Sequence, residues 1–327
     1  VATNKAVAMA SGEYLAFLDQ DDVLTPDALG EVAAYANAFP DVDIIYSDDD
    51  KLDSAGRRFG PQFKPDWSPE LLLSYMYFGH LFVVRTSLFR ACGGMRRGFE
   101  GSQDYDLALR FAEKARHIGH IPRILYHWRV HPGSTASGGG AKPYSFEAGR
   151  KAVQEAWDRS GVQARVVQPD WALQSGLGIF APLFPDDGPK VAIVICTRNR
   201  HELLRSCLES LERTSYRNWE AVIVDNGSDD PESIRYLQSV RHRVIPIPNS
   251  LDGFNYARLN NEAVKRIDAE YVLFLNNDTE VLKPDWLSQM VGWARRQGVG
   301  AVGARLLFPD GHLQHAGVTH GLYRGMA

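Results

Sequence analysis

The chain of 327 residues contains only three cysteines, Cys92, Cys196 and Cys207, and none of them shows metal-ligand spacing. So few cysteines exclude a disulfide framework and are typical of a reducing compartment. The sequence also lacks any run of the about 18 apolar residues that a membrane-spanning helix needs. We therefore expect neither a disulfide-stapled secreted domain nor a transmembrane segment in this chain.

An excess of positive charge is missing too. The 36 Lys and Arg residues face 40 Asp and Glu residues, which gives a net charge of −4. Nucleic-acid-binding proteins usually carry a basic surface, so no nucleic-acid partner is expected. The sequence starts with Val1 inside a predicted helix and shows no signal-peptide pattern. We interpret it as an internal segment, in which missing targeting signals carry no information.

A long internal repeat is the clearest positive signal. The stretch NKAVAMASGEYLAFL from Asn4 is matched by NEAVKRIDAEYVLFL from Asn261, 257 positions later. The match continues as DQDDVLTPDAL after Leu18 and as NNDTEVLKPDWL after Leu275. This period is too long for a solenoid and indicates duplicated domains. Each copy reads as helix, apolar strand, polar loop and helix, which predicts an α/β fold whose mixed sheet is covered on both faces.

The two copies contain different parts of one domain plan. Copy two begins with a strand at 191–195, a TRNR loop, and a strand at 221–224 that ends in DNGSDD. Copy one has no counterpart of this opening, but it continues past its acidic loop to Gln103-Asp104 and to the segment WRVHPGS around His131. We expect two separate partial sheets, since each copy brings its own version of the repeated strand.

Three segments follow from this division. Residues 1–132 form the later part of a first domain, and residues 190–327 form the opening part of a second. Residues 133–189 are predicted to be a linker, because they begin with GSTASGGGAKP, with one helix at 145–161.

Carboxylates follow the repeated strand in both copies. Asp19, Asp21 and Asp22 cluster at its end in copy one, and Asp278 of copy two matches Asp21. Such oxygen ligands at the carboxyl edge of a sheet suit Mg²⁺ or Mn²⁺ bound together with a diphosphate. A turn with an Asp cap before the helix at Pro26 explains the same residues without a metal, so both interpretations stay open.

The order of motifs resembles the family 2 glycosyltransferases of the GT-A fold: T-x-N after the first strand, D-x-G-S-x-D after the second, then D-x-D and a later E/Q-D. The resemblance assigns nucleotide contacts to Thr197, Asn199, Arg200 and Asp225. One departure is Asn276, which stands where the family has the first Asp of D-x-D. Without the family, the DNGSDD loop from Asp225 could also be an αL turn followed by a helix cap.

The resemblance also assigns roles in the donor site and in catalysis. Asp19 would bind the sugar nucleotide, while Asp21, Asp278 and His131 would belong to the site for Mg²⁺ or Mn²⁺ and the diphosphate. Asp104 would be the catalytic base. From the residues alone, Asp104 could also be an acidic residue that the first turn of its helix favours. Aromatic residues around the Pro-rich loop, among them His80, are expected to serve packing rather than acceptor binding.

The implied activity is transfer of a sugar from a nucleotide-diphosphate donor to a hydroxyl of a growing or lipid-linked glycan, with inversion. The resemblance further implies bacterial surface polysaccharide synthesis in the cytoplasm, with peripheral association at the inner face of the membrane. Two alternatives remain: a sugar-nucleotide-binding scaffold without turnover, and a nucleotidyltransferase. The latter would need a Gly-rich basic loop after its first strand, and the loop from Thr197 contains no Gly.

Overall fold

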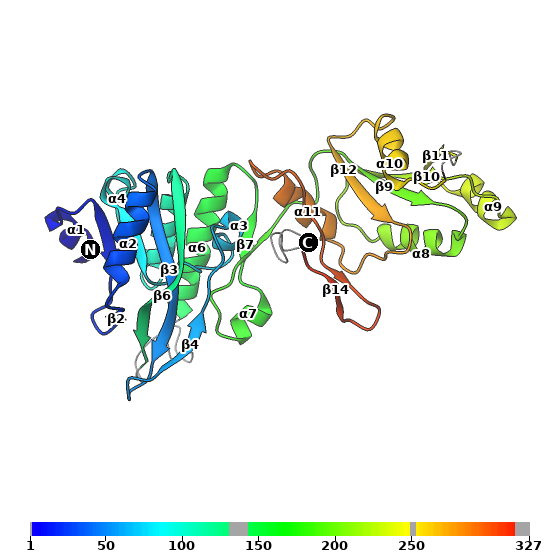
Figure 1. Cartoon of the computed structure of the whole chain (residues 1–327). Helices are drawn as coiled ribbons and strands as arrows, with labels where there is room; N and C mark the ends of the chain where they lie inside the picture. The colour runs from blue at the N-terminus through cyan, green and yellow to red at the C-terminus, as the bar shows by residue number, and fades with distance from the viewer. Residues whose placement is uncertain (1, 131–142, 249–252, 318–327) are drawn as a thin grey trace. The chain divides into compact units, whose positions relative to one another are not determined.

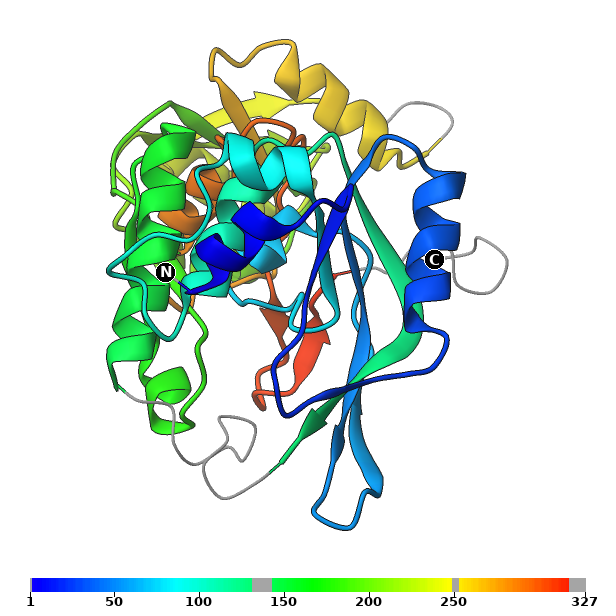
Figure 2. The ribbon, with the colours of Figure 1, turned by 90° about the vertical axis from the view of Figure 1, so that its left-hand side faces the viewer.

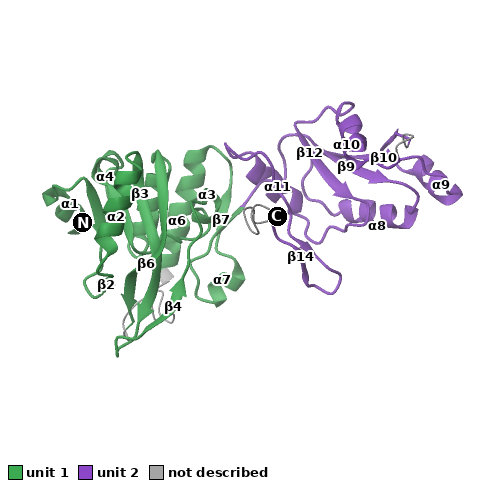
Figure 3. Ribbon diagram, in the orientation of Figure 1, with its two compact units in different colours: residues 1–182 green, residues 183–327 purple. Residues whose placement is uncertain are grey.

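A computed structural model describes residues 2–130, 143–248 and 253–317 of the chain. The chain divides into two compact units, residues 1–182 (unit 1) and residues 183–327 (unit 2) (Figure 3). Within the described ranges, no helix has the length and apolar character needed to cross a bilayer.

Unit 1 alternates helices and strands along the chain (Figure 1). Its elements are α1 (Ala2–Met9), β1 (Tyr14–Phe17), β2 (Val23–Leu24), α2 (Ala28–Ala38), β3 (Val42–Leu52), β4 (Arg58–Gln62), α3 (Pro69–Leu72), β5 (Phe82–Arg85), α4 (Thr86–Ala91), α5 (Gln103–Ala112), β6 (His117–Arg129), α6 (Pro143–Ser160), β7 (Arg165–Val167), α7 (Asp170–Gln174) and β8 (Ala181–Leu183), whose last residue belongs to unit 2.

Unit 2 continues the alternation with shorter elements. They are β9 (Val191–Thr197), α8 (His201–Leu211), β10 (Trp219–Asp225), α9 (Pro231–Ser239), β11 (Arg243–Pro246), α10 (Tyr256–Val264), β12 (Tyr271–Asn276), α11 (Trp286–Ala294), β13 (Leu306–Leu307) and β14 (Leu313–His315).

The sheet of unit 1 is mixed. Its strand order is β1-β5-β3-β6-β2, with β4 also paired to β3. The pair β3 and β6 is parallel, whereas the other pairs are antiparallel. Helix α2 covers one face through Ala28 and Val32, and α4, α5 and α6 lie on the other side of the sheet (Figure 2). Apolar side chains alternate between these two layers, as a sheet buried on both faces requires.

The sheet of unit 2 is parallel, with the order β11-β10-β9-β12. Helices α8 and α11 pack on one face, and α10 packs on the other. Along the sequence, β9 is followed by β10 and β11, which lie successively on one side of it, and then by β12, which pairs with the other side of β9. This reversal makes the β9–β12 boundary a topological switch point, where open α/β sheets bind ligands. The predicted α/β fold with sheets covered on both faces is confirmed.

The repeated strand is paired on opposite sides in the two units. In unit 2, Tyr271 N–H donates to Lys190 O, so this amide points toward β9. In unit 1, Thr86 N–H donates to Glu13 O, and backbone groups of successive strand residues point to alternate sides. The backbone of Tyr14, the counterpart of Tyr271, therefore points away from β5. Each unit has its own sheet, and the two copies use different edges of the same strand.

Helix α6 differs from the expectation in its packing rather than in its presence. The helix predicted at 145–161 is found as α6 at Pro143–Ser160. It lies within unit 1, whose boundary with unit 2 falls after Pro182. Trp157 and Val153 of α6 are completely buried. This helix is thus part of a packed layer of unit 1.

Candidate functional site

Three polar loops meet at the carboxyl edge of the unit 2 sheet. Thr197 ends β9, Asp225 ends β10 and Asn276 ends β12. The three strands are parallel neighbours in register, with Thr197 paired to Asp225 and Asn276 paired to Cys196. The TRNR, DNGSDD and NND loops therefore start side by side, as the sequence pattern predicts.

The side chain of Asn199 fastens two of these loops together. Its Oδ1 accepts hydrogen bonds from the N–H groups of Asp229 and Asp230, each at 3.0 Å. Its Nδ2 donates to Oδ1 of Asp229 at 2.8 Å, and its own N–H donates to Ser228 Oγ at 2.9 Å. The turn is closed by Asp225, whose Oδ1 accepts from both the N–H and the hydroxyl of Ser228. The amide of Asn199 is thus engaged within the protein.

The TRNR loop has an unusual backbone. Among the described non-glycine residues, only Asn199 and Arg200 have positive φ angles, 56° and 53°. Left-handed conformations strain most side chains and cluster at functional sites. They turn the chain from the end of β9 directly into α8, which begins at His201. The guanidinium-bearing Arg200 lies exposed at this turn.

The third loop closes across the switch point. Asn277 Nδ2 donates to Thr197 Oγ1 at 3.1 Å, so the loop after β12 contacts the loop after β9. Thr197 is buried, whereas Asp278, the next residue of the third loop, is exposed. At this edge of the sheet, the buried, hydrogen-bonded Thr197 lies beneath a loop whose Asp278 carboxylate is at the surface.

In unit 1, the acidic loop after β1 is held by β6. Tyr126 hydroxyl donates to Asp22 Oδ2 at 2.5 Å, and Arg129 N–H donates to Asp22 Oδ1 at 2.8 Å. Arg129 Nε also donates to the backbone oxygen of Asp21. Asp22 thus fixes the loop, while the side chain of Asp19 is 69% exposed.

His80, which lies just before β5, contacts this loop. Its Nε2 is 3.8 Å from Asp19 Oδ2, and its ring stacks on Tyr126 with centroids 4.6 Å apart. Its backbone oxygen accepts from Lys64 Nζ, an ammonium group that is buried and paired with Asp49 at 2.7 Å. Burial lowers the pKa of His80, although the carboxylates of Asp19 and Asp104 oppose this effect.

Asp104 occupies the first turn of α5, as predicted. It lies near enough to His80 and Asp19 for its charge to interact with theirs. Burial raises the pKa of Asp104, while the N–H of Tyr105 and the charge of His80 act in the opposite direction. The structure thus gathers Asp19, His80 and Asp104 within unit 1. The predicted packing of His80 is confirmed by its stacking on Tyr126. Its proximity to Asp19 was not predicted, although its place just before β5, next to the strand that carries the acidic loop, could have indicated it.

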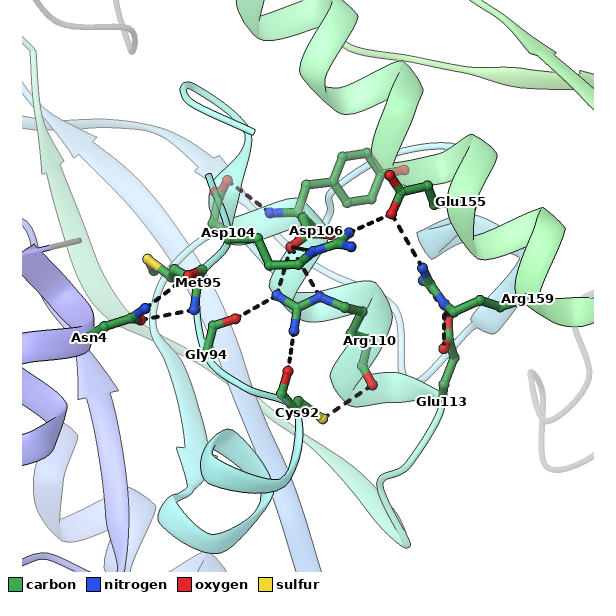
Figure 4. Close-up of polar contacts among 12 residues, drawn as sticks. Asn4, Cys92, Gly94, Met95, Asp104, Asp106, Arg110, Glu113, Glu155 and Arg159 are labelled. Atoms are coloured by element: carbon green, nitrogen blue, oxygen red, sulfur yellow. Dashed lines mark hydrogen bonds and ion pairs between the residues drawn. The ribbon is translucent and has the colours of Figure 1, made fainter. Parts of the chain in front are cut away.

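A buried ionic network anchors α5 behind Asp104 (Figure 4). Asp106 is 1% exposed and binds the guanidinium groups of Arg96 and Arg110. Arg110 also donates to the backbone oxygens of Cys92 and Gly94. Burial alone would raise the pKa of Asp106, but the two arginines outweigh burial and lower it.

The network extends to α6. Arg96 also pairs with Glu155 of α6 at 2.7 Å, so the first turn of α5 is connected to the neighbouring helix (Figure 4). A buried carboxylate shared by two arginines resists displacement, because moving it would leave charges unpaired. Asp104 therefore projects from a firmly held helix.

The carboxylates that the sequence proposes for a metal ion do not form a complete set of ligands by themselves among the described residues. Within the described ranges, no three His, Cys, Asp or Glu side chains form a set that could hold a metal ion. Asp19, Asp21 and Asp278 are carboxylates at sheet edges, which suits an open site completed by phosphate oxygens and water. His131, the other predicted ligand, lies outside the described residues.

The sequence relatives agree with the motif order. The family model described as Glycosyl transferase family 2 matches residues 1–96 and 192–320. Uncharacterized protein y4gI of Sinorhizobium fredii is 44% identical over 98% of this chain and 36% of its own length. O-antigen biosynthesis protein RfbC of Myxococcus xanthus is 41% identical over 98% of this chain and 25% of its own length. The chain thus spans between a quarter and about a third of these relatives.

Solved structures show weaker similarity. Staphylococcus aureus TarS 1–349 in complex with UDP-GlcNAc is 19% identical, with a TM-score of 0.36 over 46% of this chain and 44% of that one. Mannosyltransferase PcManGT from Pyrobaculum calidifontis, in complex with GDP-Man and Mn²⁺, is 23% identical. Its TM-score is 0.32 over 37% of this chain and 36% of its own.

Proposed function

The chain belongs to glycosyl transferase family 2, which confirms the GT-A class expected from the sequence, and on that premise we propose that its protein transfers a sugar from a nucleotide-diphosphate donor to a hydroxyl of a growing glycan. Similarity to an O-antigen biosynthesis protein favours a bacterial surface polysaccharide as the product. The proposed setting is the cytoplasm, at the inner face of the membrane.

One observation carries the proposal: the TRNR loop is hydrogen-bonded to both the DNGSDD loop and the NND loop at the switch point of the unit 2 sheet. We assign donor contacts to Thr197, Arg200 and Asp225. Because Asp225 Oδ1 is committed to the turn, its Oδ2 is the oxygen available to a ribose or base. Asn199 acts by holding the loops in place, and the exposed Arg200 suits an anionic phosphate.

For the divalent cation, we assign Asp21 of copy one and Asp278 of copy two, with Asp19 beside the former. When bound, Mg²⁺ or Mn²⁺ would supply positive charge to the departing diphosphate. The chain's own part is to hold the acidic loop rigid through Asp22, whose carboxylate is bound by Tyr126 and by the N–H of Arg129. His131 is proposed as a further member of the diphosphate site.

We assign the role of general base to Asp104. Its raised pKa brings the carboxyl closer to neutral pH, where a base accepts a proton more readily. A base that takes the proton of the acceptor hydroxyl directly agrees with a single displacement and inversion. Because α5 is fixed by the Asp106 network, the carboxylate is positioned before the acceptor binds.

Donor binding by the chain tests the proposal. Isothermal titration with GDP-mannose and UDP-N-acetylglucosamine, in Mn²⁺, should show binding of at least one donor, weakened at least about tenfold by Asp225→Asn. Asp268→Asn is the matched control, because this exposed carboxylate precedes β12 at the opposite end of the strand. Equal affinity of the wild type and Asp225→Asn would overturn the assignment.

Two alternatives give different results. A sugar-nucleotide-binding scaffold would bind the donor without transfer or donor hydrolysis by the intact protein. A nucleotidyltransferase would prefer a nucleoside triphosphate and release pyrophosphate on addition of a sugar phosphate. The absence of Gly from the TRNR loop disfavours triphosphate binding.

A further inference from the structure

A pocket of about 480 Å³ opens beside the N-terminal end of α5, and none of the residues assigned above lines it. It is lined by Gly98, Glu100, Tyr144, Glu147, Ala148 and Lys151. Two short segments build it: the loop that leads into α5, and one face of the first turns of α6. Its volume falls within the range typical of small-molecule sites.

The loop is shaped by glycines. Gly98 and Gly101 both have positive φ, 85° and 86°, a conformation that other residues rarely adopt. Between them, Phe99 is 2% exposed and is covered by the cations of Arg96 and Lys151, at 4.4 and 4.5 Å from its ring centre. Phe99 therefore anchors the loop, and Glu100 is left at the surface, lining the pocket.

The facing wall is a stripe of α6. Tyr144, Ala148 and Lys151 recur at a spacing of four and three residues, which places them on one side of the helix. Ala148 is 7% exposed, while Tyr144 is 54% exposed. A small residue between an aromatic ring and an ammonium group leaves space for a ligand.

The two walls are held at a fixed separation. Ser102 Oγ donates to Ser145 O at 2.7 Å, and a methyl group at Gly101 would lie 2.8 Å from Ser145 Cβ. Glu147 is oriented by its ion pair with Arg150 at 2.6 Å. The N–H of Gly98 hydrogen-bonds to the Glu100 carboxylate and lowers its pKa. The pocket thus presents two carboxylates, one ammonium group and one aromatic ring.

We propose that this pocket binds one uncharged sugar ring of the acceptor glycan. Carboxylates accept hydrogen bonds from sugar hydroxyls, Lys151 donates to ring or hydroxyl oxygens, and the face of Tyr144 packs on the C–H side of a pyranose. Glu100 precedes Asp104 by four residues, so the subsite adjoins the helix of the proposed base. The identification of the sugar as an acceptor rests on the proposed function.

Saturation-transfer NMR on the whole chain tests the site. The probes are methyl glycosides of mannose, N-acetylglucosamine, galactose and rhamnose. At least one should bind with a Kd in the millimolar range. Ala148→Leu, which fills the pocket, and Glu100→Gln, which removes one acceptor, should each weaken binding at least fivefold. Glu212→Gln, at an exposed carboxylate of unit 2, should leave binding unchanged.

Glu100→Gln changes an exposed side chain, so it stays informative if Ala148→Leu unfolds the unit. Equal binding by the wild type and Glu100→Gln, or no binding by any of the four glycosides, would overturn the proposal. Donor binding to unit 2 is a separate measurement, and its loss would contradict the proposed function while leaving the subsite standing.

Discussion

The Nε2 atom of His80 lies 3.8 Å from Oδ2 of Asp19, and this contact joins the acidic loop of unit 1 to the strand beside it. The two residues are 61 positions apart, yet the antiparallel pairing of β1 with β5 brings them together. His80 is held in turn by its stacking on Tyr126 and by Lys64, which binds its backbone oxygen. The side chain of Asp19 is otherwise 69% exposed, so His80 is the residue that restrains its carboxylate.

This contact predicts that His80 positions Asp19 for the donor. His80→Ala should lower the transfer rate of the intact protein about 10–100-fold, the usual cost of removing an outer partner of a metal or phosphate site. His80→Gln replaces the imidazole with an amide N–H donor of similar reach and should recover part of the rate. His117→Gln is the control, since His117 pairs with Asp41 at the other end of β6. Equal losses in the two glutamine variants would contradict a specific role.

Asp104→Asn should abolish transfer and stabilise the fold. We expect about a 10²–10⁴-fold lower rate with donor affinity nearly unchanged, because a base acts in the transition state. Since burial raises the pKa of Asp104, the wild type loses stability as pH rises from the unfolded value of about 3.9 through the folded pKa. Asn does not ionise, so the variant should gain about 2–4 °C in Tm at pH 7.5.

Thermal unfolding of both proteins between pH 4 and 8 measures this gain. The difference in Tm should be smallest at pH 4 and should grow with pH. A variant that is less stable than the wild type at every pH would instead show that Asp104 mainly stabilises the first turn of α5.

The acidic loop gives a metal prediction. In an intact first domain, Asp21→Asn should abolish the dependence of donor binding on Mg²⁺ or Mn²⁺. Asp19→Asn should have a smaller effect, because copy two has Asn276 at the matching position. Donor titrations with and without EDTA measure both effects. A wild-type affinity that EDTA does not change would refute the metal site.

The network behind α5 predicts a large stability effect. Asp106→Asn should lower the free energy of unfolding by about 3 kcal/mol at pH 7, because it leaves the half-buried Arg96 and the buried Arg110 without their shared charge. The pKa of Asp106 is lowered, so its contribution is present above the unfolded pKa and is lost as pH falls through the folded pKa. The difference in the free energy of unfolding between Asp106→Asn and the wild type should therefore decrease at acidic pH.

Glu113→Gln is the control for Asp106, because the pair Glu113–Arg159 lies at the surface with side chains 37% and 34% exposed. Its effect should stay within about 0.5 kcal/mol. Urea unfolding of the three proteins gives the comparison, and similar losses in both variants would argue against a special role for the buried carboxylate.

Local patterns predicted much of this structure. The apolar runs ending in polar residues are strands β1, β9, β10 and β12, and Asp104 lies in the first turn of a helix. Hydrophobic periodicity and local composition predict such features, because helices and strands depend mainly on residues that are close in sequence. The grouping of three loops in unit 2 also followed, since parallel strands align their carboxyl ends.

Contacts between distant residues could not be predicted in the same way. Strand β3 carries Asp48, Asp49 and Asp50, all of which are buried. Their partners His120, Lys64 and His127 come from other elements. The contact of His80 with Asp19 could not be predicted for the same reason, because it depends on which strand lies next to β1.

The pairing of the repeated strand, β1 in unit 1 and β12 in unit 2, suggests that the two partial domains could be joined into one. Because β12 is paired on the side of β9 and β1 on the side of β5, the two copies do not compete for the same edge of that strand. Splicing the sequence after Leu275 to the sequence from Asp19 would give a chimera with one strand order, β11-β10-β9-β12-β5-β3-β6. Such a domain would unite the TRNR loop and Asp104 in one sheet. A single cooperative unfolding transition would show that the halves are interchangeable modules, and two transitions would show that they are not.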